Sequence, residues 1–101
     1  MIRGYCHAVL ISFKPETDEA SRETTELLLQ NLGKNCGGEQ AGILFWKVEK
    51  NLDQRKGVHL VELGIFANLS AYELFRVHPN HHSVGRALSL VADWKIGDII
   101  I

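Results

Sequence analysis

Residues 70–82 read SAYELFRVHPNHH, and this stretch predicts how the second half of the chain folds. Ser70 followed three residues later by Glu73 is a capping-box pattern, which predicts that a helix begins there. Pro79 has no N–H group and disfavours helical geometry at the residue before it, so we expect this helix to end just before His78. The sequence therefore predicts a helix that is broken at a corner, and this corner contains three of the five histidines.

The remaining elements can be placed around this corner. Apolar runs without helical periodicity predict strands at residues 5–13, 43–49, 58–66 and 94–101. We expect a helix with Thr17 as its N-cap that runs to about Leu32, with Gly33 as its C-terminal stop. The order strand, helix, strand, strand, helix, strand is the βαββαβ arrangement of the α+β, ferredoxin-like fold class.

The composition favours one domain over residues 1–101, because 46% of the residues are hydrophobic and the net charge is −1. A near-neutral chain offers no basic surface to phosphate backbones, so no nucleic-acid partner is expected. The sequence has no run of about 18 apolar residues, so no membrane span is predicted. We interpret the apolar stretch near the N-terminus as a strand and not as a signal peptide. Cys6 and Cys36 lack CxxC or zinc spacing, which predicts reduced thiols and a cytoplasmic location.

The predicted strands are apolar on both faces, although two helices can cover only one face of the sheet. We expect one set of side chains to face the helices: His7, Val9, Ile11, Phe13, His59, Val61, Leu63 and Ile65. The other face would then carry Cys6, Ala8, Leu10, Leu60, Glu62, Gly64 and Phe66. Because an exposed apolar patch of this kind marks an interface, the sequence predicts a homodimer that forms through its sheet faces.

Several pieces of the chain together resemble a known family. They are residues 1–3, 7–15 and 57–63 and the motif His78-Pro79-Asn80-His81. Over nearly its whole length the chain is similar to the stress-responsive α/β-barrel (Dabb) family. The resemblance implies a ferredoxin-like monomer that pairs into a dimeric α+β barrel. Family members include stress proteins that form larger rings, and olivetolic acid cyclase-type members that cyclise a linear polyketide without a cofactor.

The resemblance also implies a pocket. The pocket histidines of the cyclase-type members correspond to His7, His59 and His81, and His81 takes the catalytic position. Their catalytic tyrosine corresponds to Phe75, and Tyr72 lies one helical turn earlier. We therefore expect His81 and Tyr72 to be catalytic. The expected substrate-binding residues are His7, His59, Val9, Ile11, Val61, Phe75 and Val84.

His81 is also singled out by its position in the second predicted helix, for which Asn80 is a suitable N-cap. It shares a helical face with Val84, Leu88 and Val91, so it should point toward the sheet. Three interpretations remain open: a core histidine with a hydrogen-bond partner, a general acid or base, or a metal ligand. No carboxylate or cysteine falls at a convincing spacing for metal binding, so no metal is expected.

The functional hypothesis is a cofactor-independent pocket in which His81 acts on a small apolar, carbonyl-containing or polyketide-like ligand. One alternative is a non-enzymatic, stress-associated oligomer whose histidines are structural. Another is a cofactor-free monooxygenase or isomerase of the same barrel superfamily, which rests on analogy of fold alone. An enzyme requires a cavity that reaches His81, whereas a structural protein would fill that space with side chains.

Overall fold

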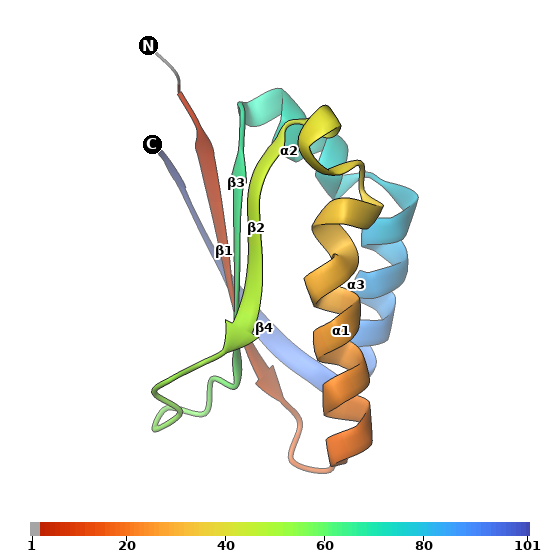
Figure 1. Ribbon diagram of the computed structural model, residues 1–101. Coiled ribbons are helices and arrows are strands. Elements are labelled where there is room, and N and C mark those ends of the chain that lie inside the picture. The colour runs from red at the N-terminus through yellow and green to blue at the C-terminus, as the bar shows by residue number, and fades with distance from the viewer. Residues whose placement is uncertain (1–2) are drawn as a thin grey trace.

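The computed structural model describes residues 3–101 as an antiparallel sheet with helices packed against one face (Figure 1). Met1 and Ile2, the first residues of the predicted domain, lie outside the described residues. The elements are β1 (Tyr5–Phe13), α1 (Glu19–Asn35), the 3₁₀ helix η1 (Gly38–Ala41), β2 (Ile43–Lys50), β3 (Leu60–Phe66), α2 (Leu69–Arg76), α3 (Pro79–Val91) and β4 (Ala92–Ile100).

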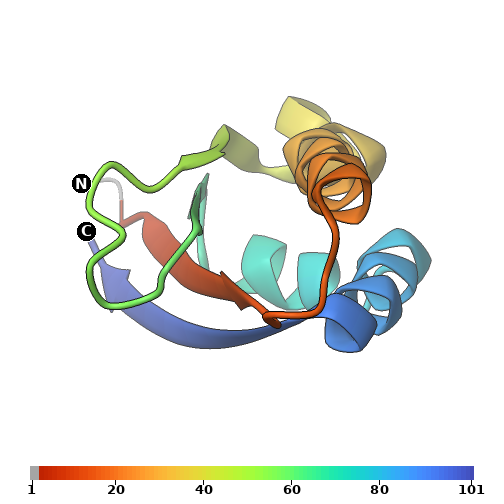
Figure 2. The same cartoon turned by 90° about the horizontal axis from the view of Figure 1, so that it is seen from below.

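The strand order is β2-β3-β1-β4, and every neighbouring pair is antiparallel. The helices lie on one side of this sheet, which leaves the other side open (Figure 2). This arrangement confirms the predicted ferredoxin-like α+β class. Within residues 3–101, no helix is long and apolar enough to cross a membrane.

The sequence analysis assigned the two faces of β3 the wrong way round, so that the face predicted to contact the helices is the outward one. Leu60, Glu62 and Phe66 are buried beneath the helices, whereas Val61 and the other odd-numbered residues of β3 face outward. Both faces of this strand are largely apolar, so alternation alone could not decide which one is buried. The pairing with β1 decides it, because the inward-facing Ile11 lies opposite Leu60. Leu60 and Phe66 therefore belong to the core of the chain. They are not part of the outward sheet face that was predicted to form the dimer interface.

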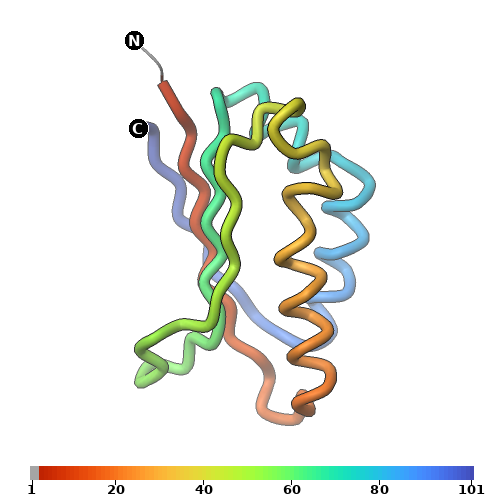
Figure 3. Tube along the Cα trace, in the orientation of Figure 1, coloured from red at the N-terminus to blue at the C-terminus, as the bar shows by residue number. Residues whose placement is uncertain are grey.

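The break between the helices forms as predicted, but α2 begins earlier. Asn68 caps this helix, since its side chain accepts a hydrogen bond of 2.9 Å from the N–H group of Ala71. Ser70 therefore lies inside the helix and is not its cap. His78 adopts an extended conformation, with φ −65° and ψ 137°, as expected for the residue before Pro79. The chain turns sharply there before α3 begins (Figure 3).

The cap of α3 is His78, where the sequence had predicted Asn80. The Nδ1 atom of His78 accepts a hydrogen bond of 3.0 Å from the N–H group of Asn80, and Pro79 occupies the first helical position. Asn80 has a different role: its side-chain amide donates a 2.7 Å hydrogen bond to the carbonyl of Asn35. This bond joins the start of α3 to the end of α1 and fixes the position of the first turn of α3, which contains His81.

The glycine predicted to stop α1 lies inside the helix. The N-cap is Asp18 instead of Thr17, and the helix continues past Gly33 to Asn35. A Cβ atom at Gly33 would lie 2.6 Å from the Cγ atom of Trp46, which is closer than real Cβ contacts allow. The indole N–H group of Trp46 donates a 2.9 Å hydrogen bond to the carbonyl of Leu29. Gly33 is therefore needed for the close approach of α1 to β2.

Substitution of Gly33 by alanine should lower the free energy of unfolding by about 1–2 kcal/mol, because the clash with Trp46 outweighs the gain in helix propensity. Gly85 in α3 is the matched control, since a Cβ atom there meets nothing within 4 Å. Gly85→Ala should stabilise the protein by up to about 1 kcal/mol. Urea unfolding of the two variants measures both effects. Equal gains in stability would contradict this role of Gly33.

Candidate functional site

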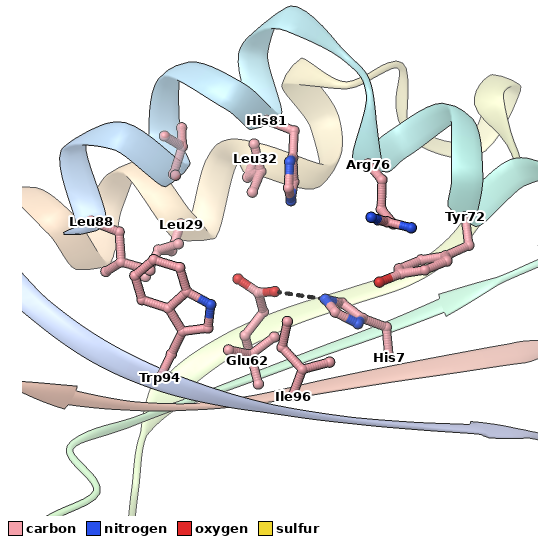
Figure 4. Close-up of a pocket in the computed structure, with 13 residues that line it drawn as sticks. His7, Leu29, Leu32, Glu62, Tyr72, Arg76, His81, Leu88, Trp94 and Ile96 are labelled. Atoms are coloured by element: carbon pink, nitrogen blue, oxygen red, sulfur yellow. Dashed lines mark ion pairs between the residues drawn. The ribbon is translucent and has the colours of Figure 1, made fainter.

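A cavity of about 110 Å³ lies between the sheet and the helices and reaches His81 (Figure 4). Its polar lining consists of His7, Glu62, Tyr72, Arg76 and His81. Its apolar walls include Val9, Leu29, Leu32, Val84, Leu88 and Trp94. An apolar pocket with a few convergent polar groups is the usual form of a small-molecule site.

His7 lies on the floor of this cavity between two carboxylates. Its Nδ1 atom is 2.7 Å from Oδ1 of Asp98, and its Nε2 atom is 3.5 Å from Oε2 of Glu62. The hydroxyl of Tyr5 donates a 2.6 Å hydrogen bond to the other oxygen of Asp98. Burial on its own would lower the pKa of His7, but the contacts with Glu62 and Asp98 outweigh it and raise that pKa. The two carboxylates therefore favour the protonated form of His7 and fix the orientation of its ring.

Sequence reasoning missed both carboxylates. Glu62 was predicted on the dimer face, but it is only 4% exposed and lies inside the cavity. Asp98 was not predicted at all, although strand pairing places it directly opposite His7. A buried histidine requires hydrogen-bond partners. This requirement was the one signal in the sequence that could have indicated acidic residues near His7. The register that identifies the partners could not be obtained from the sequence.

His81 extends from the first turn of α3 toward the sheet, as its helical phase predicted (Figure 4). Its Nδ1 atom is buried and has no hydrogen-bond partner among residues 3–101. The ring packs edge-on against Phe75, with 4.7 Å between ring centroids. Burial lowers the pKa of His81, and the positive charges of His82 and His7 lower it further. A largely neutral imidazole therefore lines the cavity at pH 7.

Tyr72 lies in the wall of the cavity next to His7. It is 7% exposed, and its ring stacks on that of Tyr5 with 4.3 Å between centroids. Burial and the negative charge of Asp98 raise the pKa of Tyr72 to about 12. The phenol is therefore protonated at neutral pH and can donate a hydrogen bond into the cavity.

The cavity brings together only some of the residues predicted for the site. His7, Val9, Tyr72, His81 and Val84 line it, and their roles in binding or catalysis stay predictions. His59, Ile11, Val61 and Phe75 do not line this cavity, which differs from the predicted grouping.

Each of these four residues lies elsewhere for a physical reason. His59 precedes β3 at the strand end remote from His7, where its Nδ1 atom accepts a 2.9 Å hydrogen bond from the N–H group of Phe13. Ile11 is completely buried in the core, and Val61 faces outward. Phe75 is 2% exposed and supports the ring of His81.

The metal interpretation finds no cluster in the described part of the chain. No group of three or more histidine, cysteine, aspartate or glutamate side chains is arranged to bind an ion among residues 3–101. Cys6 and Cys36 are free thiols, and Cys36 is buried at the end of α1.

Residues 6–101 match the Dabb family, the Stress responsive A/B Barrel Domain. The chain belongs to this family. A search of curated proteins found no match to the sequence. The family match and the likeness to solved structures are therefore the two comparisons that relate this chain to other proteins.

Solved structures share the fold of this Dabb protein at low sequence identity. A dimeric ferredoxin-like protein of unknown function from Thermobifida fusca has a TM-score of 0.84 and 12% identity, with 100% of this chain and 93% of that chain covered. A hydroxynitrile lyase from Passiflora edulis has a TM-score of 0.82 and 14% identity, with coverages of 97% and 93%. SnoaB, a cofactor-independent oxygenase from Streptomyces nogalater, has a TM-score of 0.71 and 11% identity, with coverages of 98% and 92%. These similarities establish the fold alone.

The two cavity histidines of this Dabb protein should titrate in a defined order. His81 should lose its proton below the ordinary histidine pKa of about 6.5, and His7 should lose its proton above that value. A pH titration of the imidazole signals by NMR, assigned with His7→Asn and His81→Asn variants, measures both midpoints. Equal midpoints, or the reverse order, would contradict the charge assignment of the site.

Proposed function

We propose that this Dabb protein binds a small apolar carbonyl compound in the cavity, and that His81 acts on the compound as a general base without a cofactor. The carrying observation is the position of His81, whose imidazole ring extends from the first turn of α3 and lines the cavity. A neutral imidazole can remove a proton from a carbon next to a carbonyl group. A lowered pKa favours the neutral form that this role requires.

The other polar groups of the cavity support the same chemistry. Removal of an α-proton places negative charge on the carbonyl oxygen, which is stabilised by hydrogen-bond donors fixed in advance. Tyr72 offers a neutral hydroxyl in the cavity, and the raised pKa of His7 favours a positive charge beside it. We assign the hydroxyl of Tyr72 to the oxygen of the ligand and His81 to its acidic carbon, while His7, whose two nitrogens face Asp98 and Glu62, contributes only its charge.

The size of the cavity limits the ligand. An apolar cavity of about 150 Å³ accepts benzene, and this one measures about 110 Å³. Because the lining residues Arg76 and Ile96 are exposed, the cavity is open at one edge. The proposed ligand is therefore a short branched chain or a single small ring that extends partly past this edge. The proposal shares with olivetolic acid cyclase-type members only the type of chemistry, which is proton removal without a cofactor. It does not include their substrate class, because a long polyketide would need a wider cavity.

The experiment uses cyclohexanone, a small cyclic ketone, in D₂O. If the proposal holds, the protein accelerates exchange of the α-protons for deuterium above the buffer rate, as followed by ¹H NMR. No acceleration over buffer would reject the general-base proposal.

We also propose that two copies pair through the outward face of the sheet. Leu10, Phe45 and Ile99 on this face are 42%, 44% and 63% exposed. Further apolar residues at outward positions of β1 and β3 are Cys6, Ala8, Val61, Leu63 and Ile65. A contiguous apolar surface of this kind is typical of an interface, and the relative from Thermobifida fusca is dimeric.

We propose a cytoplasmic location for the dimer. The free thiols of Cys6 and Cys36 support it, because reducing compartments preserve thiols. A thiol assay of the native, unreduced protein should detect both groups after unfolding. Detection of none would contradict the proposal.

A further inference from the structure

Arg76 is an exposed cation at the edge of the cavity. It lies at the end of α2, lines the cavity, and makes no ion pair within residues 3–101. Figure 4 shows its guanidinium group extending beside Tyr72, on the helix side of the cavity above His7. An arginine in the last turn of a helix is favourable in itself, but that effect does not require the side chain to line a cavity.

The carboxylates of the site are already bound to other donors. Asp98 accepts hydrogen bonds on one oxygen from Tyr5 and on the other from His7. Glu62 pairs with the opposite nitrogen of His7. Because both carboxylates contact His7 and neither forms an ion pair with Arg76, the N–H donors of Arg76 remain available to a group that comes from outside the chain.

We infer that Arg76 forms an anion site that binds the carboxylate of a small apolar acid. Guanidinium groups bind carboxylates through paired N–H donors, and Arg76 has these donors free of any ion pair within residues 3–101. The inference rests on the proposed function for the location of the ligand, and it adds the chemical class of that ligand.

The rest of the cavity fits the apolar part of such an acid. Leu29, Leu88 and Trp94 line the cavity together with other apolar side chains. The volume of about 110 Å³ is suited to one ring or a short branched chain. The expected ligand is therefore a monocarboxylate with a compact apolar body, whose charged end lies at Arg76.

The test compares benzoate with benzamide, which has nearly the same shape but no charge. Dissociation constants are measured at pH 7 by ¹H–¹⁵N NMR titration, with the amide signal of the cavity residue Gly85 reporting the site. The variants are Arg76→Gln and, as a matched control, Arg86→Gln. Arg86 is an exposed arginine of α3 that does not line the cavity.

Wild-type protein and Arg86→Gln should bind benzoate about fivefold or more tightly than benzamide, as expected for a charge-assisted contact. Arg76→Gln should remove this preference, and circular dichroism should show that it remains folded. The inference is overturned if wild-type protein shows no preference or binds neither compound. It is also overturned if the preference survives in Arg76→Gln, or if Arg86→Gln loses it equally.

The inference and the proposed function can fail separately. Exchange of cyclohexanone does not require a charged ligand, so exchange without a preference for benzoate would reject the anion site alone. A preference for benzoate without exchange would reject the general-base role of His81 and leave the anion site in place.

Discussion

Replacement of His81 by alanine should slow α-proton exchange of cyclohexanone by about 10²–10⁴-fold, which is the typical contribution of a positioned general base. The fold should survive, because the buried Nδ1 atom of His81 makes no hydrogen bond within residues 3–101. The substitution removes mainly the edge contact with Phe75. Exchange rates by ¹H NMR and urea unfolding of the same sample measure the two effects independently.

His82→Ala is the matched control for this substitution. His82 is adjacent to His81 but is exposed, and it does not line the cavity. Its loss should leave the exchange rate nearly unchanged. A similar decrease in both variants would show that neither acts as the base, and an unchanged rate in His81→Ala would exclude His81 directly.

The pH dependence of exchange gives a second check on the same assignment. The rate should rise with pH as His81 loses its proton, and this limb lies below pH 6.5 because the pKa of His81 is lowered. The rate should fall again above pH 6.5 as His7 loses its proton, because the pKa of His7 is raised. His81→Ala should remove the rising limb while the falling limb remains.

Local sequence signals predicted the features that depend on few residues. Pro79 fixes the helix break by sterics, and helical periodicity from Val84 onward directed His81 inward. The order of the elements followed from runs of apolar residues separated by turn residues, which determined the fold class. These signals are local, so they could be obtained without knowledge of the pairing of strands.

The composition of the site depends on strand register, which the sequence did not reveal. His59 and His7 looked equivalent because each lies near the start of an apolar run. The antiparallel pairing of β1 with β3 instead places His7 opposite Gly64. Because the register of β3 was unknown, Glu62 was predicted on the outward face of the sheet instead of the face toward the helices. A shift of one residue in a strand exchanges its two faces. The caps at Asn68 and His78 were missed because several residues near each break could serve.

The largest expected effect on stability comes from a substitution on the buried face of β3. Leu60 is 2% exposed in the core, so Leu60→Asp would bury a charge without a partner. Such a charge costs several kcal/mol, which is comparable to the total stability of about 5–15 kcal/mol of a domain. We expect this variant not to fold, as measured by circular dichroism. A folded Leu60→Asp protein would contradict the inward phase of this residue.

Leu63 is on the outward side of the same strand, so Leu63→Asp should separate the two copies and leave each copy folded. Its strand neighbour Lys47 can pair with the new carboxylate in the monomer, whereas the dimer would bury two such charges between the sheets. Sedimentation velocity at micromolar concentration should show a wild-type dimer and a Leu63→Asp monomer with native circular dichroism. Leu52→Asp is the control, because Leu52 is fully exposed outside the sheet and its replacement should affect neither fold nor assembly. A wild-type monomer, or a Leu63→Asp dimer, would reject pairing through this face.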